Sequence, residues 1–264
     1  MSAVAQSGRQ FRFTNKAFWR NPASAFFTFA FPLMFLVIFT SLLGQGEVTI
    51  EGYRLDTATY YVGAMAAFGV VSACFTNIAI TTTFNRDQGV LKRLRGTPLP
   101  ASAYMTARVL HAMVVGALLV AITLVFGMAA YDSPFPSGMP LIEFVVTFLV
   151  GSLSFAALAL ALTAVIPNAE ASPPIVNAAI LPLLFLSGIF IPLEDETPVW
   201  MTTIAEIFPV KHFADAMRAG FLGNIGSPAG RVFPFEWVDV AIVAAWGIAG
   251  LVLAARFFSW EPRR

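Results

Sequence analysis

Side chains able to perform acid–base, nucleophilic or metal chemistry are scarce in this sequence. It contains two histidines, His111 and His212, and one cysteine, Cys74, and none of them stands in a serine–histidine–aspartate pattern or a zinc-binding spacing. A single cysteine also excludes an internal disulfide framework and a thiolate metal cluster. We therefore expect no enzymatic active site, no metal site and no cofactor bound by this chain.

The sequence also lacks a nucleotide-binding motif. A phosphate-binding P-loop requires Gly-Lys followed by Ser or Thr, whereas Lys16, Lys92 and Lys211 follow Asn, Leu and Val. Work driven by ATP would therefore need a partner chain that binds ATP and Mg²⁺. The 15 acidic and 16 basic residues give a net charge of +1, so there is no strong field to attract nucleic acid.

A few polar residues in or beside apolar stretches are candidates for a substrate path. Arg108 and His111 share one helical face near an end where an arginine can reach the membrane interface, and Asn77 lies in the preceding apolar stretch. A helix–helix hydrogen bond worth about 1 kcal/mol is the commoner explanation for such an asparagine, so both interpretations stay open. Glu143 and Asp239 fall at the ends of apolar stretches, where we expect them to be solvated.

The elements that position these residues belong to a chain that is too apolar for water. Hydrophobic residues make up 58% of it and charged residues 12%, against about 25% charged in soluble domains. Crossing a membrane takes about 20 apolar residues. Six stretches are expected to form transmembrane helices: 23–43, 60–82, 103–130, 141–166, 175–191 and 237–258. The predicted fold is an all-α membrane protein with one transmembrane domain, 1–264.

The basic residues predict the orientation. With six spans, all but four of the sixteen lysines and arginines fall on the side of both termini and of the connections 83–102 and 167–174. The exceptions are Arg54, Lys211, Arg218 and Arg231. Because basic residues stay on the cytoplasmic side, both termini are predicted to be cytoplasmic.

The N-terminal stretch 6–20 has a basic helical face. Its cations recur at spacings of three and four residues: Arg9, Arg12, Lys16 and Arg20. This pattern favours an amphipathic helix that lies in the cytoplasmic interface, with its cations near anionic lipid headgroups. A simple basic flank that sets the topology is an equal alternative.

The cytoplasmic connection between the second and third spans combines apolar and charged residues. Residues 85–95 have room for about three helical turns before Gly96, which favours a helix end. Val90, Leu91 and Leu94 would form an apolar knob with a charged rim, a shape suited to docking into a cleft on another protein. The alternative is a basic loop that only sets the topology.

The outer connection 192–236 is too long and too apolar for a plain loop. We expect two short helices within 198–222 that dip into the outer leaflet or cap the outer mouth, although an amphipathic surface loop without function is an alternative. Three charged residues there favour surface ion pairs over substrate gating: Lys211, Asp215 and Arg218.

Two stretches resemble the ABC-2 type permeases. The first is FNRDQGVLKRLRGTPL at 84–99, where an acidic residue, a glycine, an aliphatic run and basic residues precede Thr-Pro. The second is LSGIFIPL at 186–193, followed by Phe-Pro-Val at 208–210 and Ala-Met-Arg at 216–218. The resemblance covers nearly the whole chain. It is greatest for the daunorubicin-resistance-like drug exporters of bacteria.

The resemblance implies a permease subunit of an ATP-binding cassette exporter in the bacterial inner membrane. Its partners would be two copies of a cytoplasmic ATPase, which bind ATP and Mg²⁺, a second permease subunit, identical or different, and membrane lipids. The residues implied in coupling to the ATPase are Asn85, Arg86, Asp87, Gln88, Gly89, Val90, Leu91, Arg93 and Leu94. The outer helices would form a re-entrant gate with Phe208, Phe213 and Met217.

The cargo follows less directly from the residues. The 26 phenylalanines offer apolar and π surface, which favours hydrophobic or amphipathic drug- or lipid-like compounds and a role in drug efflux and antibiotic resistance. Export of a cell-envelope lipid or glycan precursor, or a non-transporting scaffold or sensor, are the alternatives. A proton-driven carrier is disfavoured because no acidic residue is expected at mid-membrane.

Overall fold

The protein is described here by a computed structural model. It describes residues 3–43, 46–50, 53–97, 99–193, 197–224, 226–227, 230–231 and 234–260. Within these residues, five helical segments are long and apolar enough to cross a membrane. They are α2 (Pro22–Leu42), the continuous run of α3 (Thr57–Val71), η1 (Ser72–Thr76) and α4 (Asn77–Asp87), then α6 (Ala101–Tyr131), α7 (Met139–Leu162) and α11 (Trp237–Phe257).

Shorter elements connect and cover these helices. They are α1 (Ala3–Trp19), α5 (Val90–Arg95), α8 (Ser172–Leu186), α9 (Val199–Ile207), α10 (Pro209–Leu222) and the strands β1 (Glu47–Ile50), β2 (Tyr53–Asp56), β3 (Gly226–Ser227) and β4 (Gly230–Arg231). The strands form two antiparallel hairpins, β1–β2 and β3–β4, whereas the sequence pattern predicted an all-α fold.

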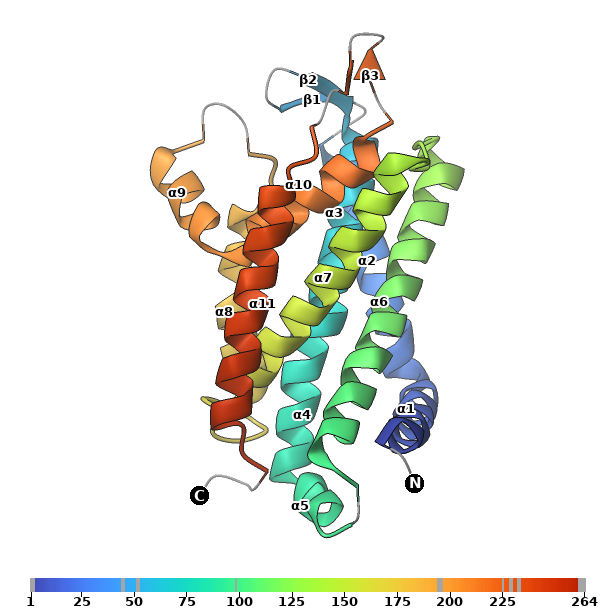
Figure 1. Cartoon of the computed structure of the whole chain (residues 1–264). Coiled ribbons are helices and arrows are strands. Elements are labelled where there is room, and N and C mark those ends of the chain that lie inside the picture. Colours follow the sequence, from blue (N-terminus) through green and yellow to red (C-terminus); the bar gives the residue numbers. More distant parts are fainter. Residues whose placement is uncertain are drawn as a thin grey trace.

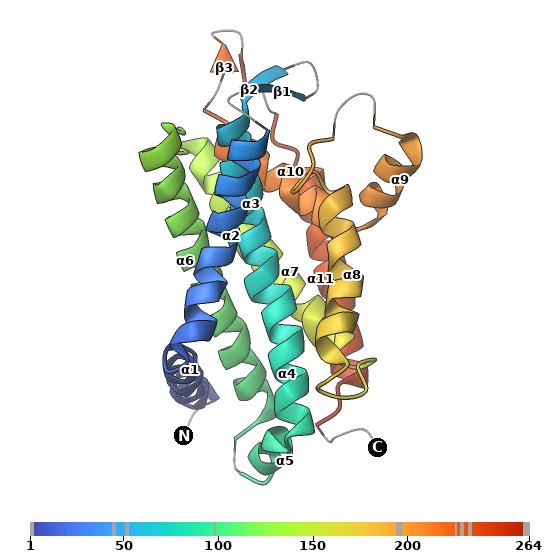
Figure 2. The same cartoon turned by 180° about the vertical axis from the view of Figure 1, so that it is seen from behind.

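The long helices form a bundle with two different ends. Helices α1 and α5 and the carboxyl end of α11 lie at one end, whereas α10 and both hairpins lie at the other (Figures 1 and 2). Helix α9 stands away from the bundle at its side in both views. The chain ends themselves, predicted to be cytoplasmic, lie outside the described residues.

Helix α3 is the centre of the bundle. All its residues except Ala58 are buried, because α2, α6, α7 and α10 pack around it. The helix continues into α4 through η1, a π-helical turn in which the backbone N–H of Asn77 bonds to the carbonyl of Ser72. Such a turn holds one more residue than an α-helical turn.

Helices α7 and α11 pack closely because glycine lies at their contact. Gly247 faces Ser154, and a side chain at Gly250 would lie 2.9 Å from the backbone nitrogen of Leu158. Gly151 of α7 likewise leaves room for the ring of Phe213 from α10. Small residues let membrane helices approach in this way.

The fifth apolar segment is shorter than predicted. Helix α8 has 15 residues, or about 22 Å at 1.5 Å per residue, which is less than the hydrocarbon thickness of about 30 Å. It ends at Leu186, before Gly188, which has a φ of 74°. Residues 187–191 of the predicted span 175–191 therefore lie beyond the helix.

Candidate functional site

The predicted coupling segment is broken into two helices. We expected one helix over 85–95, but α4 ends at Asp87 and α5 begins at Val90. Between them Gly89 has a φ of 72°, a left-handed conformation that glycine adopts without steric cost. The glycine therefore sets a sharp change of direction inside the segment, and Pro98 of the same motif lies outside the described residues.

The expected apolar knob faces the bundle. Leu91 is 0% exposed, while Val90 and Leu94 are half-buried and line a pocket beneath α1. The prediction of an outward apolar surface is therefore wrong for Leu91. The exposed residues around the break are polar or charged: Asp87, Gln88, Lys92 and Arg93.

Arg86 is also buried, contrary to its predicted place on the charged rim. Its side chain is 2% exposed, and its guanidinium donates to the carbonyl oxygens of Thr163 at 2.7 Å and of Ile166. Asp87 accepts a hydrogen bond from the backbone N–H of Ala169 at 3.1 Å. These two residues tie the end of α4 to the connection between α7 and α8, so Arg86 is not free to meet a partner protein.

The three predicted path residues, Asn77, Arg108 and His111, line one pocket of about 490 Å³. It lies between α1, α4, α5 and α6, and Arg108 donates there to the hydroxyl of Thr81. Asn85 also lines it and donates to the hydroxyl of Tyr104 at 3.3 Å. Sequence reasoning missed that the N-terminal helix α1 forms one wall of this site.

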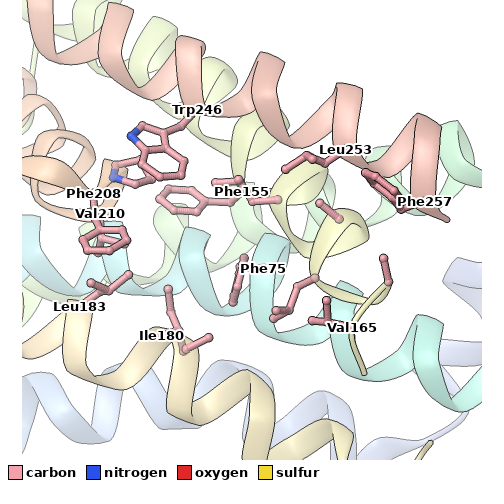
Figure 3. A pocket seen from close by; sticks show the side chains of 16 residues that line it. Phe75, Phe155, Val165, Ile180, Leu183, Phe208, Val210, Trp246, Leu253 and Phe257 are labelled. Carbon is pink, nitrogen blue, oxygen red and sulfur yellow. The ribbon is translucent and has the colours of Figure 1, made fainter. Parts of the chain in front are cut away.

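A second cavity is almost wholly apolar. It measures about 610 Å³ and lies between α7, α8, α11 and the start of α10. Phe208 and Trp246 lie at one end of it and Phe257 at the other (Figure 3). The rings of Phe208 and Trp246 are stacked 5.9 Å apart, and the indole N–H donates to the carbonyl of Ile207 at 3.1 Å. Among the described lining residues, no side chain is charged.

The predicted gate residues fall into two kinds of environment. Phe208 lines the apolar cavity, whereas Phe213 and Met217 are fully buried on α10. The ring of Phe213 lies 5.1 Å from that of Phe155. In this structure Phe213 and Met217 hold α10 against the bundle, and only Phe208 borders an open space.

The charged residues of α10 are more buried than a surface ion pair. The side chain of Arg218 is 11% exposed and donates to the Tyr60 hydroxyl, to Asp215 and to the carbonyl of Gly188. The expectation of a surface position is therefore wrong for Arg218, which fixes α10 to α3. Lys211 pairs with Asp215 at 3.0 Å. Burial works to lower the pKa of Lys211, but the Asp215 carboxylate outweighs it and raises that pKa.

Two carboxylates expected in solvent are placed differently. Glu143 is only 5% exposed. Asp239 lies 2.7 Å from Nδ1 of His212, whose Nε2 is 2.9 Å from the carbonyl of Glu206. Sequence spacing gave no signal for this pair, because 27 residues and a change of element separate its members. No group of three metal-ligating side chains occurs among the described residues.

Five apolar helices of spanning length define a multi-pass integral membrane protein, which in bacteria lies in the inner membrane. The sequence matches the ABC-2 type transporter family over residues 9–222. The chain therefore belongs to this family, whose members are generally permease subunits without catalytic activity of their own.

Individual relatives are distant. The chain is 24% identical over 203 residues to the probable multidrug ABC transporter permease YbhR of Escherichia coli K12, an alignment that covers 77% of this chain and 54% of YbhR. It is 25% identical over 241 residues to the putative transport permease YvfS of Bacillus subtilis, covering 89% of both. It is 27% identical over 194 residues to nodulation protein J of Rhizobium leguminosarum, covering 71% of this chain and 72% of that protein. The chain thus spans about half the length of YbhR.

Proposed function

We propose that this chain is the membrane permease of an ATP-driven exporter that moves hydrophobic or amphipathic, drug- or lipid-like compounds out of the cell. Membership of the ABC-2 family supports the permease role, and ABC-2 permeases work with a cytoplasmic ATPase subunit. The name of YbhR assigns multidrug transport to that relative, which favours drug-like cargo. Export of an envelope lipid or glycan precursor is the second form of the same function.

The apolar cavity supports a hydrophobic or amphipathic cargo. Its volume of about 610 Å³ is within the 300–1,000 Å³ range of ordinary ligand sites. Its described lining holds phenylalanine, leucine, isoleucine, valine, alanine and proline, with the indole of Trp246. A polar or ionic cargo would find no charged partner among these residues, whereas an apolar body would replace lipid without a desolvation penalty.

Filling this cavity tests the proposal. Ala179 of α8 lines the cavity, whereas Ala245 of α11 is exposed, so Ala179→Trp and Ala245→Trp add the same side chain at two kinds of site. The permease and its ATPase are reconstituted in vesicles, and ATP hydrolysis is measured across a panel of drugs and lipids. We expect Ala179→Trp to abolish stimulation by cargo and Ala245→Trp to keep it. Equal stimulation in both variants would contradict the cavity as the cargo site.

The proposed topology has six crossings, with α8 as the short fifth one and both termini in the cytoplasm. The common placement of α1, α5 and the carboxyl end of α11 supports an even number of crossings (Figure 1). In a Cys74→Ser background, Lys92→Cys and Glu206→Cys place single exposed thiols on α5, at one end of the bundle, and on α9, beside the other half of it (Figure 1). A membrane-impermeant thiol reagent should label Glu206→Cys in intact cells and Lys92→Cys only after permeabilisation. The reverse pattern would overturn the orientation.

The proposed assembly has two permease chains, identical or different, and two ATPase subunits that bind ATP and Mg²⁺. This sequence has no P-loop motif, which supports ATP binding by a separate ATPase subunit. The exposed apolar faces of α2 and α8, including Phe27 and Phe185, are available to a second permease or to lipid. The mass of the detergent-solubilised complex, with and without a second permease gene, distinguishes a homodimer from a heterodimer.

A further inference from the structure

A polar groove runs beneath the N-terminal helix α1. It consists of the pocket of about 490 Å³ that holds Arg108 and an adjoining hollow of about 370 Å³. Gln10, Phe13 and Leu94 line both hollows, so the two lie side by side. We call the two hollows together the α1 groove. Its walls come from α1, α4, α5 and α6, with the start of α2 at one edge.

The charge of the α1 groove is positive. Arg108 lines the larger part and Arg9 the smaller one, and among the described lining residues no carboxylate is present in either part. Arg108 donates to the hydroxyl of Thr81, a neutral group that leaves the guanidinium charge uncompensated. An arginine without a counter-charge in an enclosed site favours an anion, above all one with several acceptor oxygens.

Polar groups in the larger part can hold the oxygens of such an anion. The amides of Asn77 and Asn85 and the hydroxyl of Tyr104 line it with the guanidinium of Arg108. His111 is 7% exposed, lines the same space, and its Nδ1 has no hydrogen-bond partner among the described residues. This nitrogen is itself buried, and the His111 ring lies edge-on to the rings of Phe11 and Phe18. The groups that can contact a ligand are therefore the guanidinium of Arg108, the two amides and the Tyr104 hydroxyl.

Part of the remaining wall is apolar. Phe13, Phe18, Val90 and Leu94 line the groove beside the polar groups. Helix α6 has 31 residues, or about 46 Å, which exceeds the hydrocarbon thickness of about 30 Å. The helix therefore extends beyond the hydrocarbon region, and Arg108 is close enough to its start for the guanidinium to reach the headgroup region. A ligand that fits has an anionic head and an apolar tail.

We propose that the α1 groove binds the phosphate headgroup of an anionic lipid from the leaflet that contains α1. Arg108 and the amides of α4 hold the phosphate, and the aromatic residues of α1 contact the first part of the acyl chain. Since α5 forms one wall through Val90 and Leu94, the lipid touches the helix that follows the break at Gly89. Binding does not depend on transport, so the site goes beyond the proposed function.

The test compares lipids that differ in net charge. The purified permease is titrated in detergent with phosphatidylglycerol, with phosphatidylcholine and with inorganic phosphate, and both thermal unfolding and bound lipid by native mass spectrometry are recorded. We expect phosphatidylglycerol to bind more tightly than phosphatidylcholine. Arg108→Gln should weaken phosphatidylglycerol binding by roughly tenfold, the ratio for loss of a charge-assisted hydrogen bond. Arg108→Lys, which keeps the charge, should retain the preference and controls for folding.

Arg256→Gln is the matched control for the loss of one charge. Arg256 is exposed on α11 and does not line the groove, so this variant should bind phosphatidylglycerol like the wild type. Equal binding of both lipids by the wild type, or equal loss in Arg256→Gln and Arg108→Gln, would overturn the proposal. If inorganic phosphate alone stabilises the permease against thermal unfolding as much as phosphatidylglycerol does, the site binds free anions and the proposal of a lipid site is wrong. If Arg108→Gln lowers recovery of the ATPase without changing lipid preference, the groove is a protein interface and the proposal is wrong.

Discussion

The guanidinium of Arg86 donates to the carbonyl oxygen of Thr163 at 2.7 Å, across 77 positions of sequence. This bond joins the last turn of α4 to the first residue after α7. The carbonyls of Ile166 and Pro167 accept from the same side chain. Arg86 therefore connects the segment before α5 directly to the connection that leads into α8.

Removal of Arg86 tests this connection. Arg86→Met leaves the carbonyls of Thr163 and Ile166 without their buried donor, and hydrogen bonds to charged groups contribute about 1.5–3 kcal/mol each. We expect the free energy of unfolding in detergent to fall by about 3 kcal/mol. Arg93→Met removes an exposed arginine from α5 and should change it by less than about 0.5 kcal/mol. Equal stability of the two variants would contradict the structural role of Arg86.

The exposed face of α5 is where the proposed ATPase would dock. Arg93→Glu reverses a charge there, and we expect recovery of the co-expressed ATPase on the tagged permease to fall roughly fivefold or more, as a loss of about 1 kcal/mol implies. Arg12→Glu makes the same charge change on α1, where Arg12 is also exposed, and should leave recovery unchanged. Undiminished recovery with Arg93→Glu would remove this face from the docking surface.

The contact between α7 and α11 depends on glycine. Gly247→Ala would place a methyl group against Ser154, and overpacking of this kind costs about 1–3 kcal/mol. At Gly116 of α6 the nearest side-chain atoms would be 3.7–3.8 Å away, an ordinary contact, so Gly116→Ala should be tolerated. Unfolding by detergent titration compares the two. If Gly247→Ala is as stable as Gly116→Ala, α7 and α11 can move apart without a loss of unfolding free energy, and their contact does not depend on glycine.

The pair of Lys211 and Asp215 predicts a loss of stability at alkaline pH. The Asp215 carboxylate at 3.0 Å raises the pKa of Lys211 against the effect of burial. A raised pKa in the folded state gives stabilisation that is complete below the unfolded value of about 10.4 and disappears as the pH rises through the folded-state value. The unfolding temperature of the wild type should therefore fall more steeply above about pH 10 than that of Lys211→Met. Parallel curves would show that the pair does not stabilise α10.

The long helices were predictable because membrane crossing is a property of local sequence. Twenty apolar residues in a row specify a spanning helix whatever packs beside them, and α2, α6, α7 and α11 lie close to their predicted ranges. The end of α8 was harder to predict from the sequence, because the residues after it are as apolar as those within it. Its end depends on the backbone of Gly188 and on the contacts of that glycine with Arg218 and Tyr60.

The site was less predictable because its contacts join distant residues. The motif at 84–99 located the segment but did not distinguish its inward from its outward face. Burial of Leu91 and Arg86 follows from α5 folding back on the bundle and from carbonyls beyond α7. The grouping of Asn77, Arg108 and His111 was partly foreseen from helical spacing, whereas the wall formed by α1 required the tertiary arrangement.

The π-helical turn Ser72–Thr76 determines in which direction the side chains of α4 point. One extra residue rotates the next helix by about 100° relative to an uninterrupted α-helix of 3.6 residues per turn. Asn77, Thr81 and Asn85 recur every four residues and all line the α1 groove, so this rotation determines which neighbour they meet. Deleting a single residue such as Ala73 would turn this polar stripe away from Arg108 while every polar residue of the helix stays in place in the sequence. The polarity of the groove therefore depends on the helical geometry, which decides which residues face it, as much as on the residue types themselves.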